Sequence, residues 1–312
     1  MNKQKKLELE KQGYRIVGDH SAIKVCHWTK ECIRGRDVCY KNTFYGINTH
    51  QCVQMTPVLQ TCTHRCVWCW RDINHTSKNW IGEVDSPDLI IEGCIKAHNQ
   101  ALIGFKGNPD AESEKYSEST NPKHFAISLT GEPTFYPYLP EMIHKLHLRG
   151  ITSFLVTNGT NPIMLKKLIK EPPTQLYLTL PAPNEKVYHK VCGPLIKDGW
   201  NKIMESLNLL SKFPRSVVRL TLVKGQNMID PESYASLSKD KSDFIELKGY
   251  VHVGFSQDRL TKEDQPTHEE IKTFALTISK LIGYEIVNEK INSKVILLKN
   301  PKSKIGFNYW ES

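Results

Sequence analysis

Apolar, β-prone runs alternate with segments of helical length along this chain, and that alternation constrains the fold more than any other feature. Six runs have the apolar, β-branched character of buried strands, at residues 52–59, 125–129, 154–156, 176–180, 217–223 and 245–253. Strand and helix in alternation predict a parallel sheet with right-handed crossovers. The six similar units favour an α/β barrel or partial barrel, in which functional side chains lie at the carboxyl ends of the strands.

Capping signals support helices between these runs. Ser86 and Pro87 supply an N-cap and a first-turn proline for the helix after the first strand. Thr267 and Glu270 resemble a capping box at the start of the last helix. We expect the polar segment 108–122 to be a solvated loop without chemistry of its own. The other predicted helices span residues 139–148, 162–169 and 197–210, and the last spans 267–281.

Composition excludes several classes of protein. The 312 residues are 39% apolar and 24% charged, which is typical of a globular chain. No apolar run approaches the roughly 18 residues that span a bilayer, and the charged start is unlike a signal peptide. We therefore expect a cytoplasmic protein without membrane contact. A phosphate-binding glycine loop and a His-Glu-x-x-His helix are both absent from the sequence, so NTPase and zinc-hydrolase functions lack support.

Three of the nine cysteines form a C-x3-C-x2-C run directly after the first predicted strand. In a reducing compartment, clustered cysteines are more often metal ligands or catalytic groups than disulfides. Cys62, Cys66 and Cys69 offer three thiolates where a closed 4Fe-4S site takes four, which leaves one iron open for a substrate or cofactor. The alternatives are a zinc knuckle with His64 as a further ligand, or buried thiols without a metal.

Trp68 immediately precedes the third cysteine, so the run has the form C-x3-C-x-aromatic-C and resembles the radical S-adenosylmethionine (SAM) enzymes. Their usual core is a (β/α)6 partial barrel with the cluster loop after the first strand. The resemblance implies that Gly131, Glu132 and Pro133, after the second strand, hold the amino group of SAM. Asn158, in a Thr-Asn-Gly turn after the third strand, is a further candidate contact to SAM.

A second group of cysteines, Cys26, Cys39 and Cys52, lies upstream at 13-residue intervals. Spacing this wide is weak support for ligation, and chance cysteines are the alternative. The flanking residues 39–47 and 50–57, together with residues 251–256, closely resemble the tRNA 4-demethylwyosine synthases, the wybutosine-pathway branch of the radical SAM enzymes. This resemblance implies a second 4Fe-4S cluster on the upstream group. The remaining cysteines, which we expect to be buried small apolar groups, are Cys32, Cys94 on a helix and Cys192 in a loop.

The resemblance also implies a reaction. The downstream cluster would cleave SAM to a 5′-deoxyadenosyl radical, which takes a hydrogen from the methyl group of N1-methylguanosine 37 in tRNA-Phe. The carbon radical would attack pyruvate, and ring closure would give tricyclic 4-demethylwyosine. Lys41 matches the lysine proposed in the family to bind pyruvate as a Schiff base, and the second cluster is the alternative holder. Desolvation beside a metal centre favours the neutral amine that attacks a carbonyl.

The expected partners follow from charge and from the resemblance. Lys and Arg total 42 against 33 acids, a net charge of +9, which fits a polyanion and equally a basic enzyme. The excess gathers in residues 1–53 and 161–224, which are candidate contacts for the anticodon loop of tRNA-Phe. Eukaryotic relatives carry a flavodoxin-like domain for which this chain leaves no room, so we expect an external electron donor such as a flavodoxin or ferredoxin.

These inferences predict a radical SAM core over residues 45–285. An N-terminal extension, residues 1–44, would contribute ligands of the second cluster, and residues 286–312 would form a short C-terminal extension. Two alternatives stay open from the residues alone. One is another two-cluster radical SAM enzyme acting on RNA or a peptide, and the other is a zinc-dependent RNA-binding protein.

Overall fold

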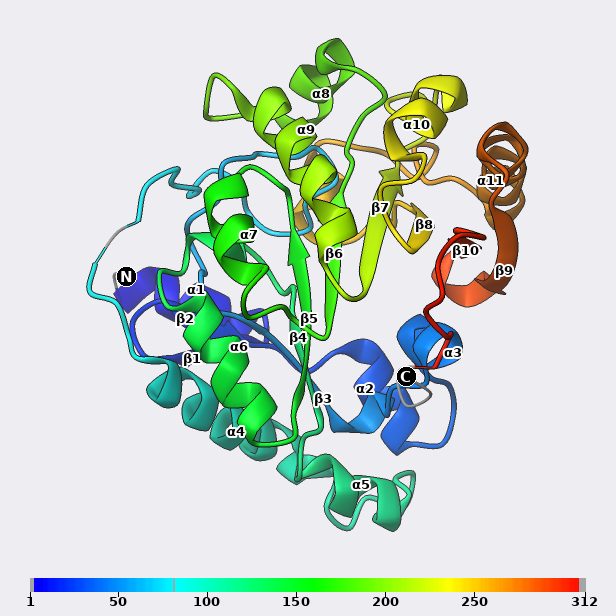
Figure 1. Cartoon of the computed structure of the whole chain (residues 1–312). Helices are drawn as coiled ribbons and strands as arrows, with labels where there is room; N and C mark the ends of the chain where they lie inside the picture. Colours follow the sequence, from blue (N-terminus) through cyan, green and yellow to red (C-terminus); the bar gives the residue numbers. More distant parts are fainter. Residues whose placement is uncertain (1–2, 81, 309–312) are drawn as a thin grey trace.

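A ten-stranded sheet forms the centre of the computed structural model, which describes residues 3–80 and 82–308 (Figure 1). Its six middle strands are parallel and adjacent in chain order, as the alternating runs predict. They are β3 (Cys52–Thr56), β4 (His124–Ile127), β5 (Thr152–Thr157), β6 (Gln175–Thr179), β7 (Ser216–Leu222) and β8 (Phe244–Gly249). The predicted (β/α)6 partial barrel is therefore confirmed.

Four antiparallel strands extend this core at its two edges. The hairpin of β1 (Arg15–Val17) and β2 (Ser21–Ile23) pairs with β3. Beyond β8 lie β10 (Val295–Lys299) and then β9 (Glu285–Lys290), both antiparallel. These four strands were not predicted: β1 and β2 are three residues long and β9 is largely polar, whereas β10 is a short apolar run that was overlooked.

Helices cover the outer face of the sheet, and the predicted ones are present. They are α4 (Pro87–Leu102), α6 (Leu139–Leu148), α7 (Pro162–Leu168), α9 (Gly199–Leu209) and α11 (His268–Ile282). Ser86 accepts a hydrogen bond from the Leu89 amide as the N-cap of α4, and Thr267 with Glu270 forms the capping box of α11. The apolar sides of these helices and of the strands form the larger hydrophobic core.

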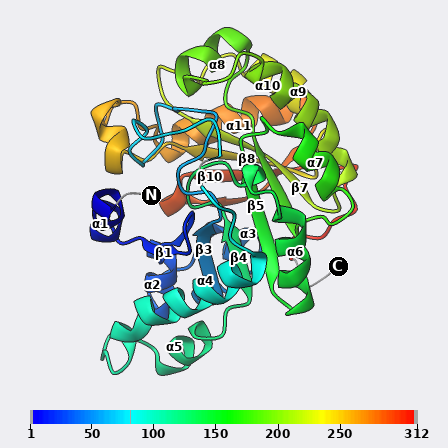
Figure 2. The same cartoon turned by 90° about the vertical axis from the view of Figure 1, so that its left-hand side faces the viewer.

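Other helices were not predicted. They are α1 (Lys3–Lys11), α2 (His27–Ile33), α3 (Tyr40–Tyr45), α5 (Ser113–Ser119), α8 (Glu185–Cys192) and α10 (Pro231–Ser238). The expectation that segment 108–122 is a loop is wrong, because α5 lies within it. That helix is polar along its length, so it has no apolar period, and tertiary contacts hold it: Glu118 pairs with His50 at 2.5 Å. The helices α5 and α8 lie at opposite ends of the molecule in both views (Figure 1, Figure 2).

The inside of the barrel holds a second, smaller core built around α3. Tyr40, Phe44 and Tyr45 pack against inward-facing side chains of the strands, among them Phe154 and Tyr177. The helix also reaches the far edge of the sheet, where Asn288 of β9 donates a hydrogen bond to the Thr43 carbonyl at 3.1 Å. Residues upstream of β3 are thereby carried into the barrel interior. Within the described residues, no helix is long and apolar enough to cross a membrane.

The capping box of α11 gives a direct test of the fold. Replacing Thr267 by Ala removes the side-chain acceptor for the Glu270 amide, and we expect the free energy of unfolding to fall by about 1 kcal/mol. Thr273→Ala, at an exposed position within the same helix, should leave stability unchanged or slightly raised because Ala favours helix. Urea unfolding of both variants measures the difference, and equal stabilities would contradict the assigned cap.

Candidate active site

The cluster loop lies at the carboxyl ends of the central strands, beside a cavity of ≈ 210 Å³. Cys62, Cys66 and Cys69 all line this cavity, as the C-x3-C-x2-C run predicts. Every residue expected to contact SAM lines it too, although these residues come from two other strand ends: Gly131, Glu132, Pro133 and Asn158. The fold thus brings the complete downstream set of predicted residues to one concave site.

Two arginines hold the cluster loop in place. Arg71 is 8% exposed and donates to the Leu59 carbonyl at 3.1 Å and to Thr76 Oγ1 at 3.0 Å. Arg259, from the segment after β8, donates through Nε to the Val67 carbonyl at 3.2 Å and through a second nitrogen to the Cys69 carbonyl. Sequence analysis identified neither residue, because both act through backbone carbonyls that no motif records.

The thiols of the loop have the chemistry of metal ligands. Burial raises the pKa of Cys62 to about 12, and the nearby Arg71 guanidinium opposes that rise. A metal ion deprotonates a coordinating thiol outright, so such a buried thiol becomes a thiolate when it binds metal. Three half-buried thiols beside a buried cation, at the edge of a cavity, therefore fit an iron-sulfur cluster with one open iron.

Glu132 connects the turn after β4 to the end of β5. It is 1% exposed, its Oε1 accepts from Thr134 and Thr157 hydroxyls, each at 2.6 Å, and its Oε2 accepts from the Asn158 amide at 2.7 Å. Burial raises the pKa of this carboxyl, while those hydrogen bonds oppose the rise. Because a carboxylate oxygen can accept two hydrogen bonds, Oε2 retains capacity for an ammonium donor.

Gly131 and Asn158 fit tightly against the cluster loop. Gly131 has φ +71°, and a Cβ at this position would lie 1.8 Å from the Val58 carbonyl oxygen. Only glycine satisfies both constraints. Asn158 Nδ2 donates to Thr63 Oγ1 at 3.0 Å and lies 3.7 Å from Cys62 Sγ. Its amide therefore contacts the loop that carries the thiols.

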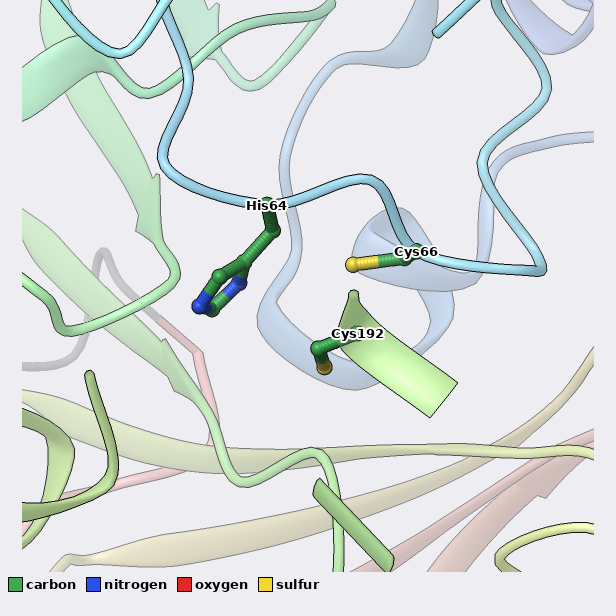
Figure 3. Close-up of side chains that lie close together, drawn as sticks. All are labelled: His64, Cys66 and Cys192. Carbon is green, nitrogen blue, oxygen red and sulfur yellow. The ribbon is translucent and has the colours of Figure 1, made fainter. Parts of the chain in front are cut away.

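The prediction that Cys192 lies in a loop is wrong, because Cys192 is the last residue of α8. It is buried, and a hydrogen bond between its thiol and that of Cys66 helps to raise the pKa of Cys66. Figure 3 shows Cys192 beside His64 and Cys66, and one ligand atom from each lies within 4.8 Å of the others. This trio has three donors, whereas a structural zinc site takes four.

The upstream cysteines surround Lys41. Cys26 and Cys39 are the N-caps of α2 and α3, and Cys52 is the first residue of β3. Burial raises the pKa of all three thiols, to about 11 for Cys39 and about 12 for Cys52, and the charge of Lys41 lowers each of them. Cysteines 26 residues apart in sequence thus converge on one lysine.

Lys41 lies in the barrel interior, where it is 7% exposed. Its Nζ is 4.7 Å from the centroid of the Tyr177 ring and 5.2 Å from that of Phe154. Burial lowers the pKa of Lys41, and the Cys39 and Cys52 thiols oppose that change. Burial thus favours the neutral amine that a nucleophilic lysine requires.

The two groups of cysteines lie at successive levels of the barrel. Val156 of β5 and Thr179 of β6 line the cavity beside the cluster loop. Phe154 and Tyr177, which contact Lys41, come two residues earlier in the same strands. Two residues of strand correspond to about 6–7 Å, so Lys41 lies one side-chain layer below the cavity.

The chamber around Lys41 also contains charged residues that sequence analysis missed. Arg219 of β7 lies opposite Glu246 of β8, and Lys248 follows two residues later on the same face. Burial lowers the pKa of Lys248 to about 8, with Arg219 adding to the effect. The available signal was a charge inside a largely apolar strand: Arg219 alone in β7, and Glu246 with Lys248 at alternate positions in β8.

Comparisons with known proteins agree with this site. Residues 56–237 match the radical SAM superfamily, and residues 239–300 match the Wyosine base formation family. The fold and the cluster loop define a radical SAM enzyme, which implies an iron-sulfur cluster and SAM as cofactors. A synthase from Pyrococcus abyssi is 47% identical over an alignment of 298 positions that covers 92% of this chain and 86% of the relative. The chain belongs to the S-adenosyl-L-methionine-dependent tRNA 4-demethylwyosine synthases.

Other relatives support the same family. The human synthase TYW1 is 41% identical over 97% of this chain, which spans 42% of the human protein. A solved structure of TYW1 with a lysine-pyruvate adduct bound has a TM-score of 0.88 at 36% identity, covering 98% of each chain. An archaeal TYW1 has a TM-score of 0.82 at 32% identity, covering 99% of each. The expected enzyme class and tRNA-modifying activity are therefore confirmed.

The close approach at Gly131 generates a prediction. Gly131→Ala should weaken SAM binding by at least about tenfold, because the added Cβ displaces the turn that carries Glu132. Gly150→Ala is the matched control, since it has φ +66° and open space around the added Cβ. That variant should lose about 1–2 kcal/mol of stability from backbone strain and keep its SAM affinity. Equilibrium dialysis of the reconstituted proteins against SAM measures both affinities. Equal affinities in the two variants would contradict the tight fit.

Proposed function

We propose that this enzyme condenses N1-methylguanosine 37 of tRNA-Phe with pyruvate to form 4-demethylwyosine. The observation that carries the proposal is a buried lysine amine among three thiols, one layer below a cavity bordered by three further thiols. The lysine-pyruvate adduct named for the similar TYW1 structure supports the same chemistry. A cytoplasmic location fits nine cysteines that are all free thiols.

In this proposal Cys62, Cys66 and Cys69 hold a 4Fe-4S cluster that, when bound, supplies the electron for reductive cleavage of SAM. Glu132 Oε2 accepts a hydrogen bond from the ammonium group of SAM. The backbone of Gly131 and Pro133 and the amide of Asn158 shape the same wall of the cavity. Reduction by a separate flavodoxin or ferredoxin stays a prediction of the family resemblance.

A second 4Fe-4S cluster is proposed on Cys26, Cys39 and Cys52. The support is proximity: the Lys41 charge lowers the pKa of each thiol, and the charges of Cys26 and Cys39 act on Cys52. Ligands of a cluster bind different irons, so they need not come as close together as ligands of a single ion. The three cysteines are half-buried, and Cys39 and Cys52 pack against the smaller core inside the barrel.

Lys41 acts as the nucleophile in this scheme. Its neutral amine attacks the ketone carbon of pyruvate, the carbonyl oxygen leaves as water, and a C=N bond joins the acid to Nζ. Desolvation favours the neutral amine before the attack. The Phe154 and Tyr177 rings that contact Nζ hold it in the chamber and exclude water from it.

RNA binding is proposed at the rim of the upper cavity. Arg65 of the cluster loop is exposed, and its amide donates to the Cys192 carbonyl at 2.8 Å. Lys190 and Lys197, exposed on either side of that residue, come from the basic stretch 161–224. Cations around the mouth of the barrel can contact phosphates of the anticodon loop while the target base enters the cavity.

The two sets of cysteines, one beside the upper cavity and one around Lys41, should have separable roles. We expect Cys69→Ala to abolish both 5′-deoxyadenosine release and 4-demethylwyosine formation. Cys39→Ala should release 5′-deoxyadenosine yet lower 4-demethylwyosine formation by at least about a hundredfold, because pyruvate is no longer positioned. Cys94→Ala, in the core away from both groups, is the control and should keep both activities. Nucleoside mass analysis after anaerobic incubation measures both products, and a Cys39→Ala enzyme with normal yield would reject the second-cluster assignment.

Removing the amine tests the Schiff base. Lys41→Ala should release 5′-deoxyadenosine while 4-demethylwyosine falls below detection, because no nitrogen remains to bind the ketone. Lys145→Ala is a suitable control, since this lysine of α6 forms an ion pair with Asp88 of α4 on the outer helices. Survival of product formation in Lys41→Ala would show that the second cluster or another group holds pyruvate.

A further inference from the structure

Polar side chains that the proposed chemistry leaves unexplained line the chamber around Lys41. Tyr177 of β6, Arg219 of β7 and Glu246 of β8 occupy inward-facing positions of adjacent strands. Three of their atoms are buried without a hydrogen-bond partner among the described residues: Tyr177 Oη, Arg219 Nε and Glu246 Oε2. A buried polar atom left unpaired costs about 1–3 kcal/mol, so three of them in one chamber indicate a polar occupant.

Arg215 is a second buried arginine of the same strand region, and its hydrogen bonds are those of a structural residue. Arg215, just before β7, donates through Nε to Gln175 Oε1 at 2.7 Å. Its terminal nitrogens donate to the Gly306 and Phe307 carbonyls at 2.9 and 2.6 Å. Arg215 is therefore held by protein acceptors, in contrast to the unpartnered Nε of Arg219.

The charges in the chamber favour an anion. Arg219 carries a fixed positive charge, Lys41 and Lys248 are amines that protonation would charge, and Glu246 is a carboxylate that acts on all three. Glu246 already accepts from the Tyr45 hydroxyl at 2.6 Å. Lys248 donates to the Ser293 carbonyl at 2.9 Å and lies over the Tyr40 ring, so Arg219 is the better placed to bind a ligand. Buried charge in excess is stable only when it is paired.

We propose that Arg219, together with the Tyr177 hydroxyl, binds the carboxylate of the 2-oxo acid that condenses with Lys41. This inference rests on the proposed function, which makes Lys41 the holder of pyruvate. A guanidinium fork matches a carboxylate in shape and charge, and a phenol donates one further hydrogen bond. The Lys41 amine lies over the Tyr177 ring, so a three-carbon acid attached to it reaches the rim of that ring.

The position of Arg219 separates this role from one in SAM binding. Its strand neighbour Thr179 lines the upper cavity, whereas Arg219 does not. The groups that act on the Arg219 charge are Tyr40, Glu246, Tyr177 and Cys39, all from the lower chamber. Although Arg219 pairs in register with Thr179, it does not line the upper cavity, and the groups around its charge favour the acid over SAM as its ligand.

The test compares pyruvate with pyruvamide, a neutral analogue that carries the same ketone. The reconstituted holoenzyme is incubated anaerobically with either compound and cyanoborohydride, without SAM or tRNA, and adducts at Lys41 are counted by peptide mass analysis. We expect the unmodified enzyme to favour pyruvate strongly. In Arg219→Gln the ratio of pyruvate to pyruvamide adducts should fall by at least about tenfold, with pyruvamide trapping and SAM affinity unchanged.

Matched variants keep the test decisive. Arg219→Lys and Tyr177→Phe should lower the ratio in part, and either replaces Arg219→Gln if that variant fails to fold. Arg215→Lys should leave the ratio unchanged. If the ratio of pyruvate to pyruvamide adducts is unaltered in the Arg219 variants, or if they lose SAM affinity instead, the inference is overturned. Either result leaves the proposed Schiff base on Lys41 unaffected. Absence of any Lys41 adduct in the unmodified enzyme would reject the proposed function of Lys41 itself, and this inference with it.

Discussion

Burial of the Lys41 amine inside the barrel is the constraint on which the site depends. A lysine is tolerated in such a place only when surrounding groups balance its charge or favour its neutral form. Here the thiols and Glu246 favour the charged form, while burial and Arg219 oppose it. The short helix α3 lies between β3 and β9 and places the Lys41 amine among these opposing groups.

The same strands serve two sites. Val156 of β5 and Thr179 of β6 line the upper cavity. Two residues earlier in the same strands, Phe154 and Tyr177 contact Lys41. The cavity beside the cluster loop and the Lys41 amine therefore lie at neighbouring levels of the same strands. In the proposed reaction, a base that enters from the rim meets the upper cavity before it reaches the level of Lys41, an order that suits hydrogen removal followed by carbon-carbon bond formation.

Much of this arrangement could be predicted from the sequence, because it is written in local patterns. Parallel strands buried on both faces appear as short apolar runs, and caps such as Ser86 and Thr267 mark helix starts. The cluster loop is a contiguous motif. The contact of Cys192 with Cys66 could not be predicted, since it joins residues far apart in sequence through the position of α8. The charged residues of β7 and β8 were missed because the sequence does not show whether a charged side chain faces the barrel interior or solvent. They are Arg219, Glu246 and Lys248.

The central proposal is that two separate groups of thiols hold iron, one beside the upper cavity and the other around Lys41. The most direct measurement is anomalous X-ray scattering at the iron edge from crystals of anaerobically reconstituted protein. The account predicts two iron peaks, one bounded by Cys62, Cys66 and Cys69 and the other by Cys26, Cys39 and Cys52. A single iron peak, or a zinc peak between His64, Cys66 and Cys192, would contradict it.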